Sequence, residues 1–318
     1  MTPASASATT AWTRSTLEPS EWLLQFPEQC IEELKETARI LDRNPLHPYL
    51  LDPHDYPTEA TRAFMTKAKA TLDRGCGFVV LDHLPVRELG RERSKDLYWL
   101  LSCMISRPVA QAFKGTMLYD VRDLGLAQTS EVRGDLTRED LNWHTDYGYN
   151  CPARYVGLLV LRVARCGGVS SVASLATLRA EMGRRHPQLL RRLFGSYVWN
   201  RALEHPDDES RTRELPVFEE VDGELRGRFN PFMIVHGQRL AGRPLDAQGQ
   251  AALDTVWDML SEHEMHTDFV LEPGQIQIVS NFHVAHRRTT YEDWDDPEQK
   301  RHLVRIFLRN SGRRSFDG

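Results

Sequence analysis

The sequence lacks the features of several protein classes. Its 318 residues include five cysteines and no Cys-x-x-Cys pair, which argues against a disulfide framework and a zinc knuckle. Lys and Arg number 40 against 45 Asp and Glu, for a net charge of −5, so the overall charge does not favour nucleic acid or an anionic membrane as a partner. The longest apolar runs, such as 155–161, are far shorter than the roughly 20 residues that cross a bilayer. We therefore expect a soluble protein that binds neither nucleic acid nor membrane.

Nucleotide-binding and targeting motifs are also missing. No Gly-x-Gly-x-x-Gly lies between a strand and a helix, and no Gly-Lys-Ser/Thr is present, so dinucleotide-binding and phosphate-loop folds are excluded. The N-terminus is rich in Ala, Ser and Thr but has no apolar stretch of the kind found in a secretory signal. We expect a disordered tail at 1–18, a single domain at 19–318 and a cytoplasmic location. The sequence does not determine the oligomeric state.

The hydrophobic pattern changes along the chain from helical to strand-like spacing. Helices are predicted at 21–43, 58–74, 95–105, 175–194 and 247–263. Strands are predicted at 78–81, 116–121, 143–147, 155–163, 170–174, 196–202, 217–221, 224–229, 233–235, 267–271, 275–279 and 303–309. Helices followed by many short strands indicate an α+β protein built on an antiparallel sandwich or barrel.

Three His-x-Asp tripeptides are the first candidates for chemistry: 144–146, 205–207 and 266–268. With 12 histidines and 45 acids in the chain, chance alone gives roughly two such matches, so context has to separate them. The second is a polar stretch around a proline, and the third follows a charged helix end. The first lies among aromatic residues on a predicted strand, where His144 and Asp146 would share a face.

A third metal ligand must come from elsewhere in the chain. The apolar strand at 275–279 is followed by two histidines, His283 and His286. Because they are three residues apart, they would face opposite ways on a regular strand, and only one could reach the metal. Two histidines and one carboxylate suit non-haem Fe(II). Zinc accepts the same ligands, so a zinc hydrolase is an alternative.

Two arginines favour iron over zinc. Arg301 and Arg305 share a face of a predicted strand but stand about 13 Å apart at ~3.3 Å per residue. Each could bind a different carboxylate through paired N–H donors. This spacing predicts one arginine for a dicarboxylate co-substrate and one for a second acid. His302 alternates with both and is expected to point away.

Four motifs in order resemble the taurine dioxygenase and clavaminate synthase-like family of Fe(II)/2-oxoglutarate oxygenases. They are Trp143-His144-Thr145-Asp146, Gly167-Gly168-x-Ser170, Asn281-x4-His286 and Arg301-x3-Arg305. The resemblance runs from about residue 77 to the C-terminus. It implies a double-stranded β-helix (jelly-roll, cupin-like) core with N-terminal helices and a lid insertion, for which 124–140 is the candidate.

The resemblance also implies roles for individual residues. It makes His144, Asp146 and His286 the Fe(II) ligands, and its spacing to the arginines favours His286 over His283. Arg301 would bind the C5 carboxylate of 2-oxoglutarate, assisted by Ser170 or Ser171 where the family commonly has Thr. Arg305 would contact an acidic group of the substrate or the C1 end of 2-oxoglutarate. Tyr149 and Asn150 are further candidates for substrate contact, as are Arg228 and Asn230.

The implied reaction consumes O2 and 2-oxoglutarate, releases succinate and CO2, and hydroxylates a small acidic or amino-acid-derived molecule. Because Asp146 fills the third protein position on the metal, chlorination is not expected. Two alternatives to this function remain besides the zinc hydrolase. One is a cupin-type oxygenase that does not use 2-oxoglutarate, and the other is a jelly-roll binding protein without activity.

Overall fold

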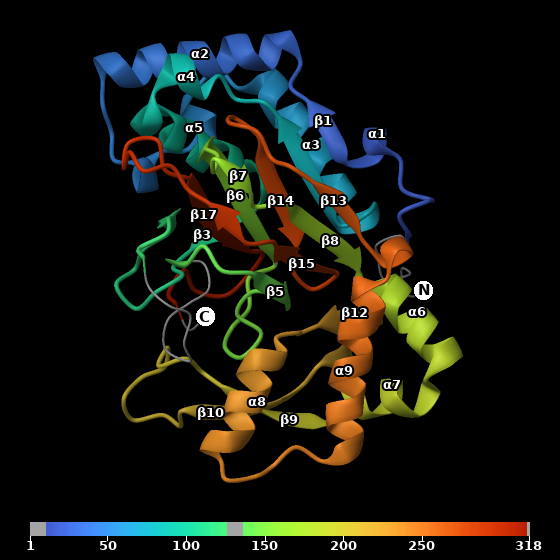
Figure 1. The fold of residues 1–318 in the computed structure, drawn as a ribbon. Coiled ribbons are helices and arrows are strands. Elements are labelled where there is room, and N and C mark those ends of the chain that lie inside the picture. The colour runs from blue at the N-terminus through green and yellow to red at the C-terminus, as the bar shows by residue number, and fades with distance from the viewer. Residues whose placement is uncertain (1–10, 126–135, 317–318) are drawn as a thin grey trace, which may run out of the picture.

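The structure is a computed structural model that describes residues 11–125 and 136–316. Two β-sheets form its centre, with one group of helices beside the larger sheet and a second group beside the smaller one (Figure 1). None of the helices in the described ranges is both long enough and apolar enough to span a bilayer.

The larger sheet has seven strands in the order β1-β2-β14-β6-β17-β3, with β4 also paired to β17. These strands are β1 (Leu23–Gln25), β2 (Phe78–Asp82), β3 (Arg107–Val109), β4 (Leu118–Val121), β6 (Tyr155–Arg162), β14 (Ile276–Ser280) and β17 (His302–Arg309). All of its pairs are antiparallel except β1 with β2. Helices α2 (Glu28–Arg43), α3 (Glu59–Arg74) and α5 (Arg91–Ile105) cover one face, and α1 (Pro19–Trp22) and α4 (Val86–Leu89) are short (Figure 1). A large cluster of buried apolar side chains joins these helices to the sheet.

The smaller sheet has four antiparallel strands in the order β13-β8-β15-β5. They are β13 (Thr267–Phe269), β8 (Ser170–Ser174), β15 (Val284–Arg288) and β5 (Leu141–His144). Val172 and Val284 from this sheet share a core cluster with Val156, Val279 and Phe307 from the larger one. The two sheets therefore pack face to face, as aligned sheets do in β-sandwiches.

A second helical layer covers the outer face of the smaller sheet (Figure 1). Its helices are α6 (Leu175–Arg185), α7 (Pro187–Leu193), α8 (Pro231–Leu240) and α9 (Ala247–Ser261). The remaining strands of the described residues form three two-stranded ribbons: β9 (Ser196–Asn200) with β10 (Thr212–Pro216), β11 (Phe218–Val221) with β12 (Glu224–Gly227), and β7 (Cys166–Gly167) with β16 (Tyr291–Glu292). Short 3-10 helices lie at Pro48–Leu50, Pro53–Asp55 and His263–Met265.

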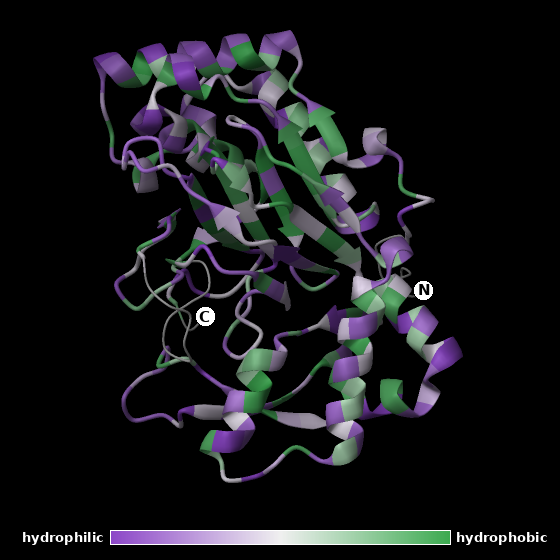
Figure 2. Cartoon of the chain, viewed as in Figure 1, coloured by the Kyte–Doolittle hydropathy of each residue, from purple (hydrophilic) through white to green (hydrophobic). Residues whose placement is uncertain are grey.

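Side chains alternate between the two faces of the smaller sheet, so the residues that pack against the helices and the residues that line the cavity lie on opposite faces. Trp143 and Ala285 point outward into the cluster formed with α6, α8 and α9. Their neighbours His144 and His286 point inward and line a cavity between the sheets. The strands around this interior carry many apolar residues, whereas the outer faces of the helices are largely hydrophilic (Figure 2). The apolar side chains of each strand pack in the core and fix the position of the strand. The polar side chains that alternate with them therefore reach the interior at defined positions.

Two predicted elements differ from the structure. Residues 233–235, predicted as a strand, lie inside α8, where Asn230 caps the helix by accepting a hydrogen bond from the backbone of Met233 and Pro231 occupies its first turn. The predicted helix 21–43 is interrupted by β1, because Pro27 follows that strand and starts α2. In both places the local effect of a proline on the backbone outweighs the secondary structure that the hydrophobic periodicity predicts.

The expected tail at 1–18 is ordered over its second half. Residues 1–10 lie outside the described residues, but Trp12 is 4% exposed. Its indole N–H donates to the carbonyl of Cys76 at 2.8 Å, and its backbone N–H and C=O both bond the Thr177 hydroxyl. The composition of this segment predicted disorder, but one buried aromatic side chain attaches it to the core.

Packing of α8 on β9 gives a stability prediction. A Cβ at Gly237 would lie 2.4 Å from backbone atoms of Val198, Trp199 and Asn200. Gly237→Ala should therefore lower the free energy of unfolding by about 1–3 kcal/mol, as overpacking does, although alanine favours helices. Gly183→Ala is the matched control, because its nearest neighbour would be a Leu190 methyl group at 3.5 Å; it should gain up to ~1 kcal/mol. Urea unfolding of both variants measures the difference, and equal stabilities would contradict this account.

Candidate metal centre and co-substrate cavity

The register of β5 and β15 brings two histidines together. His286 pairs directly with His144 across these antiparallel strands, and the centroids of the two rings are 4.3 Å apart. Asp146 follows the end of β5 in a turn, so it approaches from the turn and not from the strand that was predicted to continue to 147. Its Oδ2 is 3.2 Å from Nε2 of His286. One ligand atom from each of the three residues lies within 4.8 Å of the other two.

Burial sets the protonation states of this cluster. His144, Asp146 and His286 are each 8–9% exposed. Burial, followed by the neighbouring His286, lowers the pKa of His144 to about 4. For Asp146 burial acts the other way, but the hydrogen bond and charge of His286 and the charge of Arg305 hold its pKa well below the usual range. A neutral imidazole and an ionised carboxylate are the states that bind a metal ion.

Hydrogen bonds around the cluster hold the candidate ligands in place. Nδ1 of His144 lies 2.7 Å from the carbonyl of Asn142, which leaves Nε2 for the cluster. The side-chain oxygen of Asn281 accepts from the backbone N–H of Asp146, and its amide donates to the backbone carbonyl of Asp146, both at 2.8 Å. Nδ1 of His286 is buried and has no hydrogen-bond partner among the described residues. No hydrogen bond from the described residues to this nitrogen therefore draws the ring away from the cluster. A divalent metal that takes two imidazoles and a carboxylate fits this set.

The cavity beside the cluster is strongly cationic. Four arginines and a single carboxylate, Asp146, are among its lining residues. The lining residues are Val121, Leu141, His144, Asp146, Val156, Leu158, Ser170, Gln277, His286, Arg287, Arg288, Arg301, Leu303 and Arg305. Both arginines singled out in the sequence, Arg301 and Arg305, therefore face the cluster from β17 and the residue before it. Such a cavity suits anionic ligands.

The two arginines are held differently. The guanidinium of Arg301 lies 5.0 Å from the ring centroid of Tyr291, and burial lowers its pKa. Nη1 of Arg305 is 3.5 Å from Oδ1 of Asp146, and its Nε donates to the Gln111 side-chain oxygen at 2.8 Å. Arg305 is therefore next to the metal cluster, and Arg301 is farther along the same cavity.

The structure separates the alternatives at three positions. Ser170 lines the cavity, whereas the Ser171 hydroxyl bonds to the carboxylate of Asp268 at 2.5 Å. His283 lies in the turn before β15, where Nε2 is 3.0 Å from Glu224. His302 points away from the cavity, with its ring nitrogens 2.6 Å from Asp120 and 2.7 Å from Arg122.

Four other residues predicted to contact substrate lie outside the cavity lining. The Tyr149 hydroxyl is 3.5 Å from the carboxylate of Glu204, and the Asn150 amide donates to the backbone carbonyl of Glu204 at 2.7 Å. Arg228 pairs with Glu219, and Asn230 caps α8. Of the candidate lid at 124–140, residues 126–135 lie outside the described residues. Substrate contact by Tyr149 and Asn150 stays a prediction.

Sequence reasoning missed two residues of the site. Arg288 lines the cavity two positions after His286, and its Nη2 donates to the carbonyl of Thr137 at 3.1 Å. The period of two along a strand could have identified it once β15 was recognised. Gln111 binds Arg305 from a segment just after β3. Nothing in the local sequence around Gln111 indicates this contact.

Comparison with known proteins identifies the family. The family model described as "Taurine catabolism dioxygenase TauD, TfdA family" matches residues 43–307. The chain belongs to this family. It is thus a dioxygenase of the Fe(II)- and 2-oxoglutarate-dependent type, as its motifs predicted. A relative, the FR-33289 synthase of Streptomyces rubellomurinus (strain ATCC 31215), is 27% identical over 311 residues, which cover 96% of this chain and 90% of the synthase.

Solved structures share the fold of this TauD/TfdA family member. An asparagine oxygenase in complex with Fe(II), 2S,3S-3-hydroxyasparagine and succinate has a TM-score of 0.71 at 17% identity. The non-haem iron oxygenase OrfP in complex with Fe and alpha-ketoglutaric acid has a TM-score of 0.65 at 16% identity. Each match covers 91% of this chain and 94% of the other. The helical and sheet elements described above are thus those of an established oxygenase architecture.

The contacts of Asn281 give a prediction for metal binding. Asn281→Ala removes both hydrogen bonds that fix the backbone of Asp146, so the carboxylate loses its fixed orientation. Iron affinity should fall about 10–100-fold, the usual effect of losing an outer-sphere partner. Titration of the apoprotein with Fe(II) measures it. Asn44→Ala, at the exposed C-terminus of α2, is the control and should bind iron like the parent chain. An unchanged affinity in Asn281→Ala would contradict the assignment.

Proposed function

We propose that in this Fe(II)/2-oxoglutarate-dependent dioxygenase His144, Asp146 and His286 hold the iron and Arg301 holds the co-substrate. The observation that carries the proposal is the convergence of two imidazoles and a carboxylate beside a cavity lined by arginines. Two histidines and one carboxylate leave open positions on non-haem Fe(II). When bound, iron and 2-oxoglutarate supply the oxidising power, with O2 consumed and succinate and CO2 released.

Arg301 and Ser170 are suited to the C5 carboxylate of 2-oxoglutarate. The guanidinium offers paired N–H donors in one plane, which match a carboxylate. Its contact with the ring of Tyr291 restrains that plane. The Ser170 hydroxyl lines the same cavity, and the engagement of Ser171 with Asp268 favours Ser170 for this role. These residues would bind the carboxylate end of the co-substrate and orient it in the cavity beside the metal cluster.

Arg305 is suited to an acidic group of the substrate. It is adjacent to Asp146, and Gln111 fixes its orientation by accepting from Nε while donating to the Arg305 carbonyl at 3.0 Å. The neighbouring structures contain 3-hydroxyasparagine and (3S)-hydroxy-L-Arg, both hydroxylated amino acids with an α-carboxylate. We propose an amino-acid-derived substrate whose acidic group binds Arg305 and whose C–H bond is hydroxylated.

The finer features of the fold and location belong to the same proposal. Two facing sheets with strand orders β13-β8-β15-β5 and β1-β2-β14-β6-β17-β3 are consistent with a double-stranded β-helix core. We propose that residues 19–318 form one domain around it. All five cysteines are free, which supports a cytoplasmic location because reducing compartments keep thiols unpaired.

Replacement of the candidate ligands tests the iron site. His144→Ala and Asp146→Ala should each lower Fe(II) affinity by more than about 100-fold, since even outer partners are worth 10–100-fold. Both should also abolish formation of succinate from 2-oxoglutarate when amino acids and their derivatives are supplied. His205→Ala, in another His-x-Asp tripeptide that is absent from the cavity lining, is the control and should retain iron and turnover. Parental turnover in either ligand variant would refute the assignment.

Kinetics can separate the roles of the two arginines. Arg301→Met removes charged hydrogen bonds worth roughly 1.5–3 kcal/mol, so KM for 2-oxoglutarate should rise about 10–100-fold while iron binding is retained. Arg305→Met should instead raise KM for the prime substrate and leave uncoupled succinate formation largely intact. Steady-state assays with each substrate varied in turn provide the measurement. Equal effects of both variants on 2-oxoglutarate would show that the two roles are not divided in this way.

A further inference from the structure

A second arginine-rich cavity lies away from the metal cluster. It has a volume of about 550 Å³, and we call it the arginine cavity. Its lining residues are Cys151, Pro152, Arg154, Glu224, Arg226, Arg228, Phe282, Arg309, Asn310, Ser311 and Gly312. None of them lines the co-substrate cavity. Four guanidinium groups therefore face one carboxylate.

The two cavities lie at different points along β17. Arg309 is four residues after Arg305 on the same face of the strand, a separation of about 13 Å. Phe307 lies between them, and its ring centroid is 5.4 Å from that of Tyr147, which in turn is 5.3 Å from that of Phe316. This aromatic group separates the interior around the metal cluster from the arginine cavity. A ligand in one cavity would not extend into the other.

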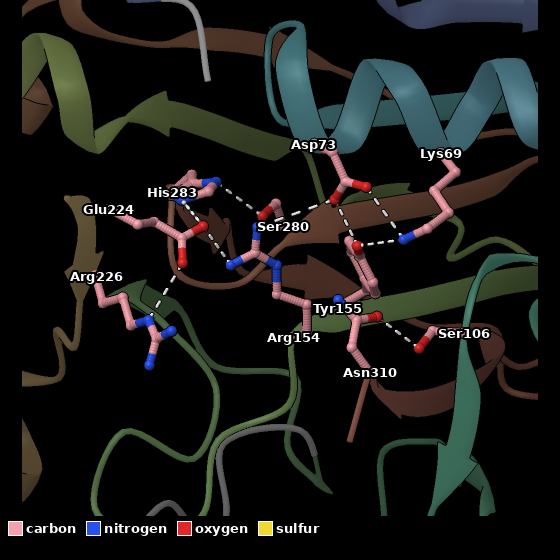
Figure 3. Close-up of polar contacts among 10 residues, drawn as sticks. All are labelled: Lys69, Asp73, Ser106, Arg154, Tyr155, Glu224, Arg226, Ser280, His283 and Asn310. Carbon is pink, nitrogen blue, oxygen red and sulfur yellow. Dashed lines mark hydrogen bonds and ion pairs between the residues drawn. The ribbon is translucent and has the colours of Figure 1, made fainter. Parts of the chain in front are cut away.

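The single carboxylate of the cavity is already shared. Glu224 lies 2.5 Å from Nη1 of Arg154, 3.2 Å from Nε of Arg226 and 3.0 Å from Nε2 of His283 (Figure 3). Burial opposes its ionisation, but the hydrogen bonds from His283 and Arg154 lower the pKa of Glu224 to about 2. Asp73 lies 3.9 Å from Nη2 of Arg154 as a second, more distant carboxylate. Within the cavity itself, the charge of Glu224 is shared by two guanidinium groups and an imidazole, and the lining as a whole keeps a positive excess.

Of the other two arginines, Arg309 carries the excess charge, and Arg228 has unsatisfied N–H groups. Arg309 is 6% exposed; its Nη atoms donate to the Cys151 sulfur at 3.1 Å and to the carbonyl of Ser315 at 2.5 Å, and no carboxylate of the described residues pairs with it. Arg228 pairs with Glu219 through Nη2 only. Nε of Arg309, and Nε and Nη1 of Arg228, are buried without a hydrogen-bond partner among the described residues. Buried guanidinium groups stay charged and are costly without a counter-ion.

An adjoining cavity shows that this imbalance is local. It shares Arg154, Glu224, Arg226 and Asn310 with the arginine cavity. There Lys69 and Arg74 are matched by Asp73 and Asp222, and Lys69 pairs with Asp73 at 3.1 Å (Figure 3). The excess positive charge is therefore concentrated on the side that holds Arg228 and Arg309.

We propose that the arginine cavity binds a small organic anion with at least two negative charges, carried by phosphate or carboxylate groups. The volume suits a molecule and not a lone ion. Phe282 offers an apolar surface for its carbon skeleton, with the guanidinium groups of Arg154 and Arg226 at 5.5 and 5.3 Å from its ring centroid. The anion supplies the counter-charge that Arg309 lacks and hydrogen-bond acceptors for the unsatisfied N–H groups of Arg228.

Isothermal titration calorimetry on the iron-loaded protein tests the site with two probes. Pyrophosphate represents phosphate groups and citrate represents carboxylates. Sodium chloride at matched ionic strength is the reference. At least one probe should bind, and Arg226→Gln and Arg228→Gln should each weaken it tenfold or more. Arg226 is the more exposed of the two, so its replacement should leave the fold intact, as thermal unfolding will show. The probe that binds more tightly identifies the acidic group.

Two controls locate the bound anion. Arg184→Gln removes a surface arginine from an exposed pair with Glu181 and should not change the affinity. Arg301→Met removes an arginine of the co-substrate cavity and should not change it either. Affinity lost in Arg301→Met but kept in Arg226→Gln and Arg228→Gln would place the anion beside the iron and overturn the proposal. Failure of both probes to bind above chloride would also overturn it.

Cys151 provides an independent readout inside the cavity. It is half-buried and contacts Arg309, whereas Cys166 is exposed and distant from the cavity lining. Peptide mass spectrometry after brief treatment with iodoacetamide measures alkylation at both sites in one sample. The probe that binds should slow modification of Cys151 at least threefold and leave Cys166 unchanged. Equal rates at Cys151 with and without the bound probe would contradict occupancy of this cavity.

Discussion

The pairing of β5 with β15 is the interaction on which the site depends. Antiparallel neighbours place His144 directly opposite His286, at the short cross-strand distance that this pairing imposes. The outward partners in the same strands, Trp143 and Ala285, are buried against the second helical layer. A slip of β5 by one residue would turn His144 into that apolar cluster and bring Trp143 inside. Core packing therefore enforces the geometry of a polar site.

Charge distribution follows from this arrangement. The interior between the sheets has few carboxylates, and Asp146 is the acidic residue among those lining the co-substrate cavity. Arg301 and Arg305 alternate with Leu303 along β17 and its preceding residue, so the same strand that packs apolar residues also delivers two cations to the cavity. Arg309 continues the series at the other end of the strand. The repeated spacing of four residues distributes positive charge along one face of β17, between two separate cavities.

The sequence predicted the chemistry of the site better than its surroundings. His144 and Asp146 could be selected because a predicted strand and metal-ligand chemistry restrict which residues act together, although Asp146 lies in the turn after β5. The choice of His286 over His283 and the role of Arg301 came from the resemblance to the family. The family assignment and the dependence on iron and 2-oxoglutarate are confirmed by the comparisons. Gln111 could not be selected, because its contact with Arg305 arises from tertiary packing between segments 194 residues apart.

Local structure was harder to predict where one residue overrides a pattern. Trp12 orders a segment whose composition is typical of disorder, and Asn230 with Pro231 starts a helix where the apolar run suggested a strand. The strand β15 was not predicted, although it carries His286, because two adjacent arginines conceal its alternation. The Trp12 contacts and the pairing of β15 depend on partners that are distant in the chain, whereas the start of α8 depends on a local cap.

The β5–β15 register also explains how such a chain can diverge. A residue inserted within either strand would destroy the opposition of the two imidazoles, whereas the connections outside the paired strands can change length freely. Selection thus acts on a few paired positions and on the apolar residues beside them. Solved structures that match 91% of this chain at only 16–17% identity agree with a fold whose sequence can vary widely outside such packed positions.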